Sequence, residues 1–196
     1  FLFALVGLKG DHAAEVDSKS GGSVDAQPRS FPQIYGATFV GGAPENTRGS
    51  VVRIQEGSAG IFSNMVITNG KTGIENKDCG AENRTQKSPG GIVDMQYLYL
   101  YDKNVVFNSH GGDFTQIVLD NKTCKYVEGY PLAVNSNPSI LNLPYSATET
   151  GILQGLDPRP DPCGELYRDV DSPYASSSFF TPTSYKGAFG VTNWLK

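Results

Sequence analysis

The feature that most constrains the fold is a strand pattern that recurs with no helical segment between its copies. The segment 33–42 (QIYGATFVGG) returns as 60–70 (GIFSNMVITNG) and, more loosely, as 91–102 (GIVDMQYLYLYD). Shorter segments of a second kind alternate with them: 50–57 (SVVRIQEG), 72–78 (TGIENKD) and 104–112 (NVVFNSHGG). The period of roughly 27 to 33 residues suits a solenoid, whose coils bury apolar residues only against one another. The pattern predicts an all-β chain folded as a right-handed parallel β-helix.

The composition agrees with this fold and excludes several classes of function. The 196 residues suit one domain or a piece of a longer solenoid, and 23 Gly and 12 Pro imply many turns. The net charge of −4 comes with scattered basic residues, so we expect no nucleic-acid partner. The opening segment, FLFALVGL, is far shorter than the roughly 20 residues that a membrane span needs. We therefore expect it to be a core strand that continues from a missing coil, and the chain not to span a membrane.

The pattern divides the chain into three parts. Residues 1–30 are predicted to be this strand plus an acidic loop. Residues 31–124 carry the coils, and their turn-rich stretch 75–91 is predicted to leave the barrel as a loop insertion. Residues 125–196 hold most of the prolines, which cannot donate to a strand ladder. We expect them to form an extended, aromatic-rich segment that caps the solenoid.

The cysteines and two sequons indicate an oxidising, extracellular compartment. The three cysteines, Cys79, Cys124 and Cys163, are disulfide candidates, and three buried free thiols are the alternative. Asn83 and Asn121 each begin an Asn-X-Thr sequon close to a cysteine, so both are candidate glycosylation sites. Together they predict a secreted, cell-surface glycoprotein.

The beginning of the coil region and the ending of the chain also resemble a known family. The segments RSFPQIYGATFVGG and NTRGSVVRIQEGSAGIFSNMVITN, and the ending SSFFTPTSYKGAFGVTNWLK, resemble large secreted right-handed β-helix proteins, which are largely uncharacterised cell-surface proteins of bacteria and algae. Their terminal signature, YxGAFG followed by an Asn-Trp pair, is matched by residues 185–190 and 193–194. The signature's Gly-Trp-Thr continuation is missing after Lys196, which suggests part of a longer protein. The resemblance implies a β-helix and a surface location, and no particular reaction.

Aromatic side chains gather in this ending: Phe179, Phe180, Tyr185, Phe189 and Trp194. Each ring buries on the order of 150–250 Å², enough to seal an end or clasp a side of the barrel. A sugar-binding platform is the alternative. A second aromatic set, Tyr97, Tyr99 and Tyr101, alternates along one strand and predicts a contact strip for a protein or glycan.

Three groups of residues could carry chemistry. Asp11, Glu15 and Asp17 would share one face of a strand, apart from His12, and form a candidate Ca²⁺ patch or a solvated acidic face. Acidic residues also follow one another in the Pro-rich tail, and we expect them to be turn residues: Asp157, Asp161, Glu165, Asp169 and Asp171. His110 is predicted to be a corner residue, because the chain has no GxSxG nucleophile motif. No catalytic residue is therefore assigned, and no cofactor other than this Ca²⁺.

These observations favour a non-enzymatic structural or adhesive protein, a β-helical component of a cell-surface assembly or filament. Its expected partners are other subunits of that assembly or surface glycans. The alternative is a glycan-binding module or a carbohydrate-active β-helix, a polysaccharide lyase or hydrolase. The available cations near its coil faces are Arg53, Lys71 and Lys103. Convergence of Arg53 and a carboxylate in one groove would favour the enzyme.

Overall fold

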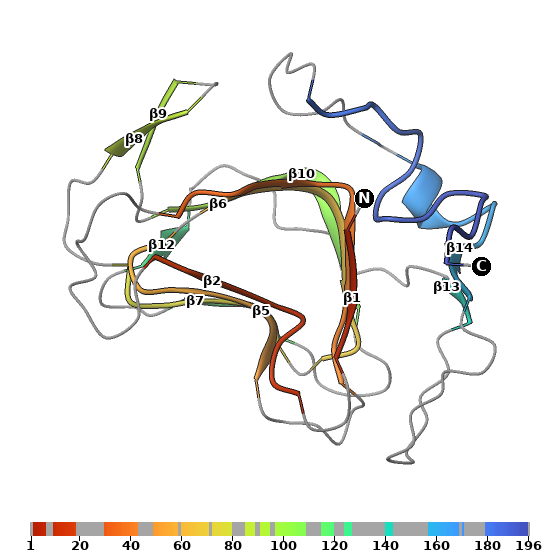
Figure 1. Ribbon diagram of the computed structural model, residues 1–196, viewed down its shortest axis with the longest axis horizontal. Coiled ribbons are helices and arrows are strands. Elements are labelled where there is room, and N and C mark those ends of the chain that lie inside the picture. The colour runs from red at the N-terminus through yellow and green to blue at the C-terminus, as the bar shows by residue number, and fades with distance from the viewer. Residues whose placement is uncertain are drawn as a thin grey trace.

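A computed structural model gives the arrangement of the strands (Figure 1). It describes residues 2–6, 10–18, 30–42, 49–58, 60–70, 72–79, 85–88, 91–94, 97–108, 115–119, 124–126, 140–142, 157–168, 170 and 179–195. For residue 61, and for most residues of the strands between 85 and 142, the backbone alone is described. Nearly all regular structure in these ranges is β-strand, with one short 3₁₀ helix, η1 (Glu165–Tyr167).

The larger sheet, sheet A, is built from parallel strands that follow one another in chain order. The order is β1 (Leu2–Leu5), β4 (Ala37–Val40), β6 (Gly60–Thr68), β10 (Tyr97–Asn108) and β12 (Lys125–Tyr126), and β3 (Gln33–Tyr35) also pairs with β6. Figure 1 shows the sheet turning through a corner, so that β3 and β4 pair with successive halves of β6.

The second sheet, sheet B, has the same parallel sense and the same chain order. It runs β2 (Ala14–Asp17), β5 (Ser50–Gln55), β7 (Thr72–Asn76) and β11 (Thr115–Leu119). Each pass of the chain therefore adds a strand to sheet A and then one to sheet B. The described residues establish two facing parallel sheets, and the right-handed β-helix remains a prediction.

Residues with positive φ stack at the corners between these strands. Gly36 and Asn64 have φ of 68° and 50°, and the Gly36 amide donates to the Ser63 carbonyl of the neighbouring pass. A second corner repeats the arrangement with Glu56 at 56° and Asp78 at 51°. Non-glycine residues enter this backbone region only when surrounding contacts hold them there. The corners are thus fixed by pass-to-pass contacts as well as by glycine.

The space between the sheets is filled by apolar side chains. Phe39, Phe62 and Met65 of sheet A meet Ile54 and Ile74 of sheet B, and all are at most 1% exposed. Strand alternation explains the choice, since neighbours such as Thr38 and Ser63 take the outer face.

The third long strand differs from the sequence expectation. The pattern predicted one strand over 91–102 and a second kind of strand over 104–112. The structure instead pairs β8 (Thr85–Ser88) with β9 (Gly91–Asp94) as an antiparallel hairpin, so the 75–91 insertion contains a strand. β10 then runs through both predicted segments, with a register shift between Tyr101 and Val105 where β6 bends at Asn64. Residues 104–108 therefore continue the strand in sheet A. The position in sheet B that the sequence pattern had given to 104–112 is occupied by β11.

The ends of the chain also show a difference. The acidic loop expected within 1–30 includes strand β2, because the alternation of its AEVD sequence places small or apolar residues inward. In the last third, β13 (Ile140–Asn142) and β14 (Asp157–Pro160) form an antiparallel pair. Residues 179–195 have no helix or strand, as expected of an irregular ending. Figure 1 shows this blue segment beside β1, outside the two sheets.

Candidate functional site

The outer face of sheet B carries a row of charged side chains. The register places Glu15 of β2 beside Arg53 of β5, and Arg53 beside Glu75 of β7. Register partners in a parallel sheet point to the same side, here away from the core residues Val52 and Ile54. Two strand spacings separate the backbones of the two glutamates, which is about 10 Å.

The row is held by side-chain contacts. Arg53 Nε donates to Glu75 Oε2 at 2.8 Å, with 23% and 26% of the two side chains exposed. Beside it, Gln55 Nε2 donates to Glu15 Oε1 at 2.6 Å. Such an arrangement offers carboxylate acceptors and guanidinium donors to a hydroxylated ligand. Arg53 cannot act as a base, because a guanidinium does not lose its proton in proteins.

The candidate Ca²⁺ residues do not gather into a ligand set. Glu15 and Asp17 are exposed on the outer face of β2, as the alternation predicted, and Asp11 is exposed before that strand. Among the described residues no group of three or more His, Cys, Asp or Glu side chains could hold a metal ion. The geometry therefore favours the solvated acidic face.

His12 lies apart from those carboxylates and contacts the next pass of the chain. Its Nδ1 is 2.5 Å from the Ser50 carbonyl oxygen, so it donates there in the tautomer that carries the Nδ1 proton. Gly49 packs against the ring: a Cβ built there would lie 2.4 Å from His12 Cε1. His12 Nε2 is buried with no hydrogen-bond partner in the described part of the chain. These contacts assign His12 a packing role.

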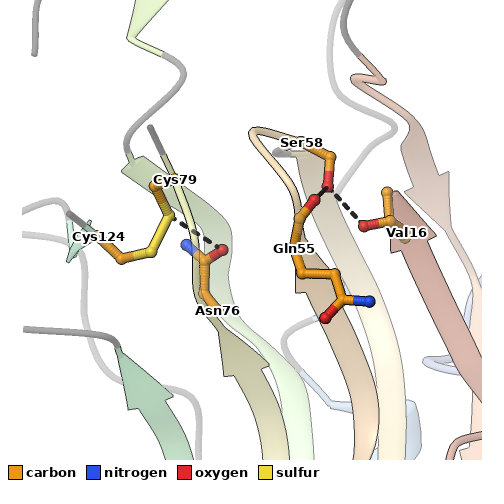
Figure 2. Close-up of a disulfide and its surroundings, with 6 residues drawn as sticks. All are labelled: Val16, Gln55, Ser58, Asn76, Cys79 and Cys124. Carbon is orange, nitrogen blue, oxygen red and sulfur yellow. Dashed lines mark hydrogen bonds between the residues drawn. A yellow bond between two sulfur atoms is a disulfide. The ribbon is translucent and has the colours of Figure 1, made fainter. Parts of the chain in front are cut away.

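Successive passes are joined at the corner after sheet B (Figure 2). Ser58 donates to the carbonyl of Gln55 in its own pass and reaches the Val16 carbonyl of the preceding one. The Gly57 amide donates to the Asp78 carbonyl of the following pass at 2.7 Å.

A disulfide continues this corner. Cys79 and Cys124 are bonded across 45 residues, with Cα atoms 5.1 Å apart. Figure 2 shows the Asn76 amide turned toward the sulfur, with Oδ1 3.4 Å from Cys79 Sγ. The contact is not a hydrogen bond in the oxidised protein, because a disulfide sulfur carries no proton. The third cysteine, Cys163, is free and exposed.

The ending of the chain forms a strap, defined as residues 185–190, against the outer face of sheet A. The Gly187 amide donates to the Asn64 carbonyl at 2.7 Å, at the corner of β6. The Ala188 amide donates to Thr38 Oγ1 at 2.9 Å, within buried surroundings. Residues 186–190 are buried, Lys186 included at 4% exposed. The residues of the sequence signature thus lie against the outer face of sheet A.

The aromatic residues of the ending divide into three groups. Phe189 is 1% exposed and contacts the Phe3 ring of β1 edge-on, while Trp194 stacks on it. Phe179 is 83% exposed and contacts Phe180, which packs on Tyr35. Tyr185 contacts Tyr167 edge-on, and burial raises the pKa of both phenols. Sequence reasoning found the rings but missed Thr38 and Asn64, which bind the strap and show no motif.

The acidic residues of the tail act as turn and ion-pair residues where they are described. Asp157 binds the Arg159 guanidinium at 2.5 and 2.7 Å, and this hydrogen bond raises the pKa of Arg159. The Asp161 carboxylate accepts from the Cys163 amide at 2.9 Å, and Glu165 pairs with Arg168. None of these contacts forms a pair of free carboxylates across a cleft.

Several predicted residues lie outside the described ones. These are the sequon residues Asn83 and Asn121, together with His110, Lys71, Asp169 and Asp171. The backbone of Tyr97, Tyr99 and Tyr101 lies in β10 as a strand, and their side chains are outside the described part, as is that of Lys103.

Comparison with known proteins adds no relative. No protein family, curated protein or solved structure matches this chain. Within the described residues there is no helix of the length and apolar character that crossing a bilayer requires.

Proposed function

We propose that this chain is a non-enzymatic structural component of an extracellular surface assembly, built as a right-handed parallel β-helix. The observation that carries the proposal is the linkage of successive passes. Two parallel sheets add one strand per pass, and the corner beside them is joined by Ser58, by the Gly57 amide and by the Cys79–Cys124 disulfide. A stack of this kind is a rigid rod with flat faces, which suits lateral packing in a coat or filament.

The disulfide supports the extracellular part of the proposal. Disulfides persist in oxidising compartments and are rare in the cytosol. The sequons at Asn83 and Asn121 lie close in sequence to the two bonded cysteines and would carry N-linked glycans in such a compartment.

Electron microscopy of the native particle, with its neighbouring subunits retained, tests the proposal. We expect filaments or a multi-subunit coat in which the chain repeats, with glycan density at Asn83 or Asn121. Isolated monomers without glycans would contradict both the structural role and the surface location. Glycopeptide mass spectrometry of the same preparation provides an independent check of the two asparagines.

A carbohydrate-active protein is the second candidate, and the row on sheet B favours it. Glu15 and Glu75 flank Arg53 on a partly exposed face, and glycoside hydrolysis commonly uses a pair of carboxyl groups. Arg53 is paired with Glu75, and its guanidinium does not lose a proton in proteins. It would therefore bind the carboxylate of a uronate and would not abstract a proton from the sugar.

Incubation with polygalacturonate, alginate and neutral β-glucans separates the two candidates. New reducing ends that disappear in both Glu15→Gln and Glu75→Gln would establish a glycan-cleaving enzyme and overturn the non-enzymatic proposal. Retention of activity in both variants would place the chemistry elsewhere.

A further inference from the structure

Trp194 has one covered face and one open face. Its ring stacks on Phe189 with centroids 4.7 Å apart and planes 9° from parallel, and Phe189 is fixed in turn by the edge of Phe3 at 5.1 Å. Trp194 is nevertheless 45% exposed. Because one face of the ring lies against Phe189, we infer that the exposed area of Trp194 includes the opposite face.

The indole is also held in place by its polar atom. Nε1 donates to the Ala188 carbonyl at 2.9 Å, and Ala188 is anchored to Thr38 of sheet A. The ring is therefore fixed before any ligand arrives, and its only donor is already used. What it presents is a flat π face, whose negative quadrupole attracts weakly positive C–H groups.

The surroundings of the ring combine apolar and charged groups. Val191 and Leu195, in the same loop, are 71% and 44% exposed. The Val191 carbonyl accepts from Arg159 at 3.1 Å, which brings the Asp157–Arg159 ion pair to this loop. A pyranose ring matches both features, because it has an apolar C–H face and a rim of hydroxyl groups. A protein partner would call for a wider apolar patch with a depleted charge content.

We propose that the open face of Trp194 is a stacking platform for a pyranose ring of a glycan, with the Asp157–Arg159 pair beside it for hydroxyl or carboxylate groups. This goes beyond the structural role and does not depend on assembly, so a monomeric protein would show it equally. Neutral and uronate sugars share the pyranose face, and Arg159 distinguishes them by charge.

Fluorescence provides a direct test, since Trp194 is the only tryptophan in the 196 residues. Full-length chain is titrated with cellohexaose, laminarihexaose and hexagalacturonate at millimolar concentrations. We expect a saturable shift of the emission to shorter wavelength with at least one of them, because stacking removes water from the open face. An emission shift with hexagalacturonate alone that is lost in Arg159→Gln would identify a uronate ligand. An emission shift with the neutral hexamers would show that stacking on the ring face is sufficient for binding.

Two variants separate the loss of the π face of Trp194 from a change in the packing on Phe189. Trp194→Leu keeps an apolar cover on Phe189 without the π face, and Trp194→Tyr keeps a ring. By saturation-transfer NMR we expect Leu to weaken binding about tenfold and Tyr to retain most of it. Phe179→Ala, which removes an exposed ring from the separate Phe180 group, should leave binding unchanged. Unchanged emission with all three hexamers, or equal binding by the Leu variant, would overturn the platform.

Discussion

At the scale of single residues, Gly187 is the position of the strap that should tolerate a substitution least. Its φ is 84°, and a Cβ there would lie 2.6 Å from Thr38 Oγ1 and 2.9 Å from Val66 Cγ2. Gly187→Ala therefore combines backbone strain with overpacking, and we expect a loss of about 3 kcal/mol in the free energy of unfolding, measured in urea.

Gly36→Ala is the matched control for that substitution. Gly36 has a similar φ of 68°, but among the described residues its Cβ would meet only the Gly187 carbonyl oxygen, at 3.4 Å. Strain alone should then cost about 1 kcal/mol. Equal losses in the two variants would show that the contacts of the strap with Thr38 and Val66 are absent in solution.

The phenol of Tyr167 gives a second residue-scale prediction. Its hydroxyl is buried without a partner among the described residues, so Tyr167→Phe should be neutral or stabilising near pH 7. Burial raises the pKa of this phenol above its ordinary 10.0, so the folded chain holds the proton more tightly than the unfolded chain. That contribution is complete below pH 10 and is lost as the pH rises through the folded pKa.

We therefore expect the stability of the parent chain to fall more steeply than that of Tyr167→Phe above pH 10, in urea unfolding followed by circular dichroism. Parallel curves for the two proteins would contradict a buried phenol. Burial also raises the pKa of the Tyr185 phenol. The variant Tyr185→Phe therefore measures how much of the fall in unfolding free energy above pH 10 comes from Tyr185.

At the scale of elements, the attachment of the strap depends on Thr38 of β4. Thr38→Val keeps the shape of the side chain but leaves the buried Ala188 amide without its acceptor, at a cost of about 1–3 kcal/mol. Hydrogen exchange should become faster at Ala188 and Gly187 and stay unchanged in β5, because the strap opens locally. Thr38→Ser, which retains the oxygen, should preserve protection. Normal protection in the Val variant would show that the bond to Thr38 is not needed, and that the Gly187–Asn64 bond and the aromatic contacts hold the strap.

The recurrence of strand-forming residues predicted the strands of the first passes. Segments 33–42, 50–57, 60–70 and 72–78 contain β3 to β7, and they are rich in the Val, Ile, Tyr, Phe and Thr residues that parallel sheets prefer. β10 was divided in two by the prediction because its polar residues 102–104 (DKN) interrupt the apolar sequence as a turn would. In the structure these three residues lie opposite the single Asn64, within one strand. A register shift of this kind depends on the neighbouring strand. The periodicity within one segment carries no information about that strand.

At the scale of the whole molecule, the contacts that attach the ending could not be predicted from the repeat. Ala188 and Thr38 are 150 residues apart, and a threonine on an outer strand face looks like any solvated residue. The sequence shows the residues of the charged row on sheet B but not their pairing, because the register of β5 and β7 determines that Arg53 lies beside Glu75. The aromatic signature did predict a cover, because large rings must be buried against something. Which surface they cover is a property of the folded sheets.

The Cys79–Cys124 disulfide should make a large contribution to the stability of this stack. It closes a segment of 45 residues that includes β10 and β11, so its loss would leave a whole pass unrestrained in the unfolded chain. The chain-entropy relation gives about 4 kcal/mol for a loop of this length. We expect the double variant Cys79→Ser/Cys124→Ser, and the parent after reduction, to unfold at a lower urea concentration by a similar margin.

Cys163→Ser is the matched control for this prediction, because that thiol is exposed and free. Its free energy of unfolding should stay within about 0.5 kcal/mol of that of the parent. A non-reducing peptide map must show the 79–124 linkage in both the parent and this control. If the double variant unfolds at the same midpoint as the parent, the passes are held by the sheets and the Ser58 corner alone. A large loss in the double variant would instead make the stability of the rod depend on an oxidising environment.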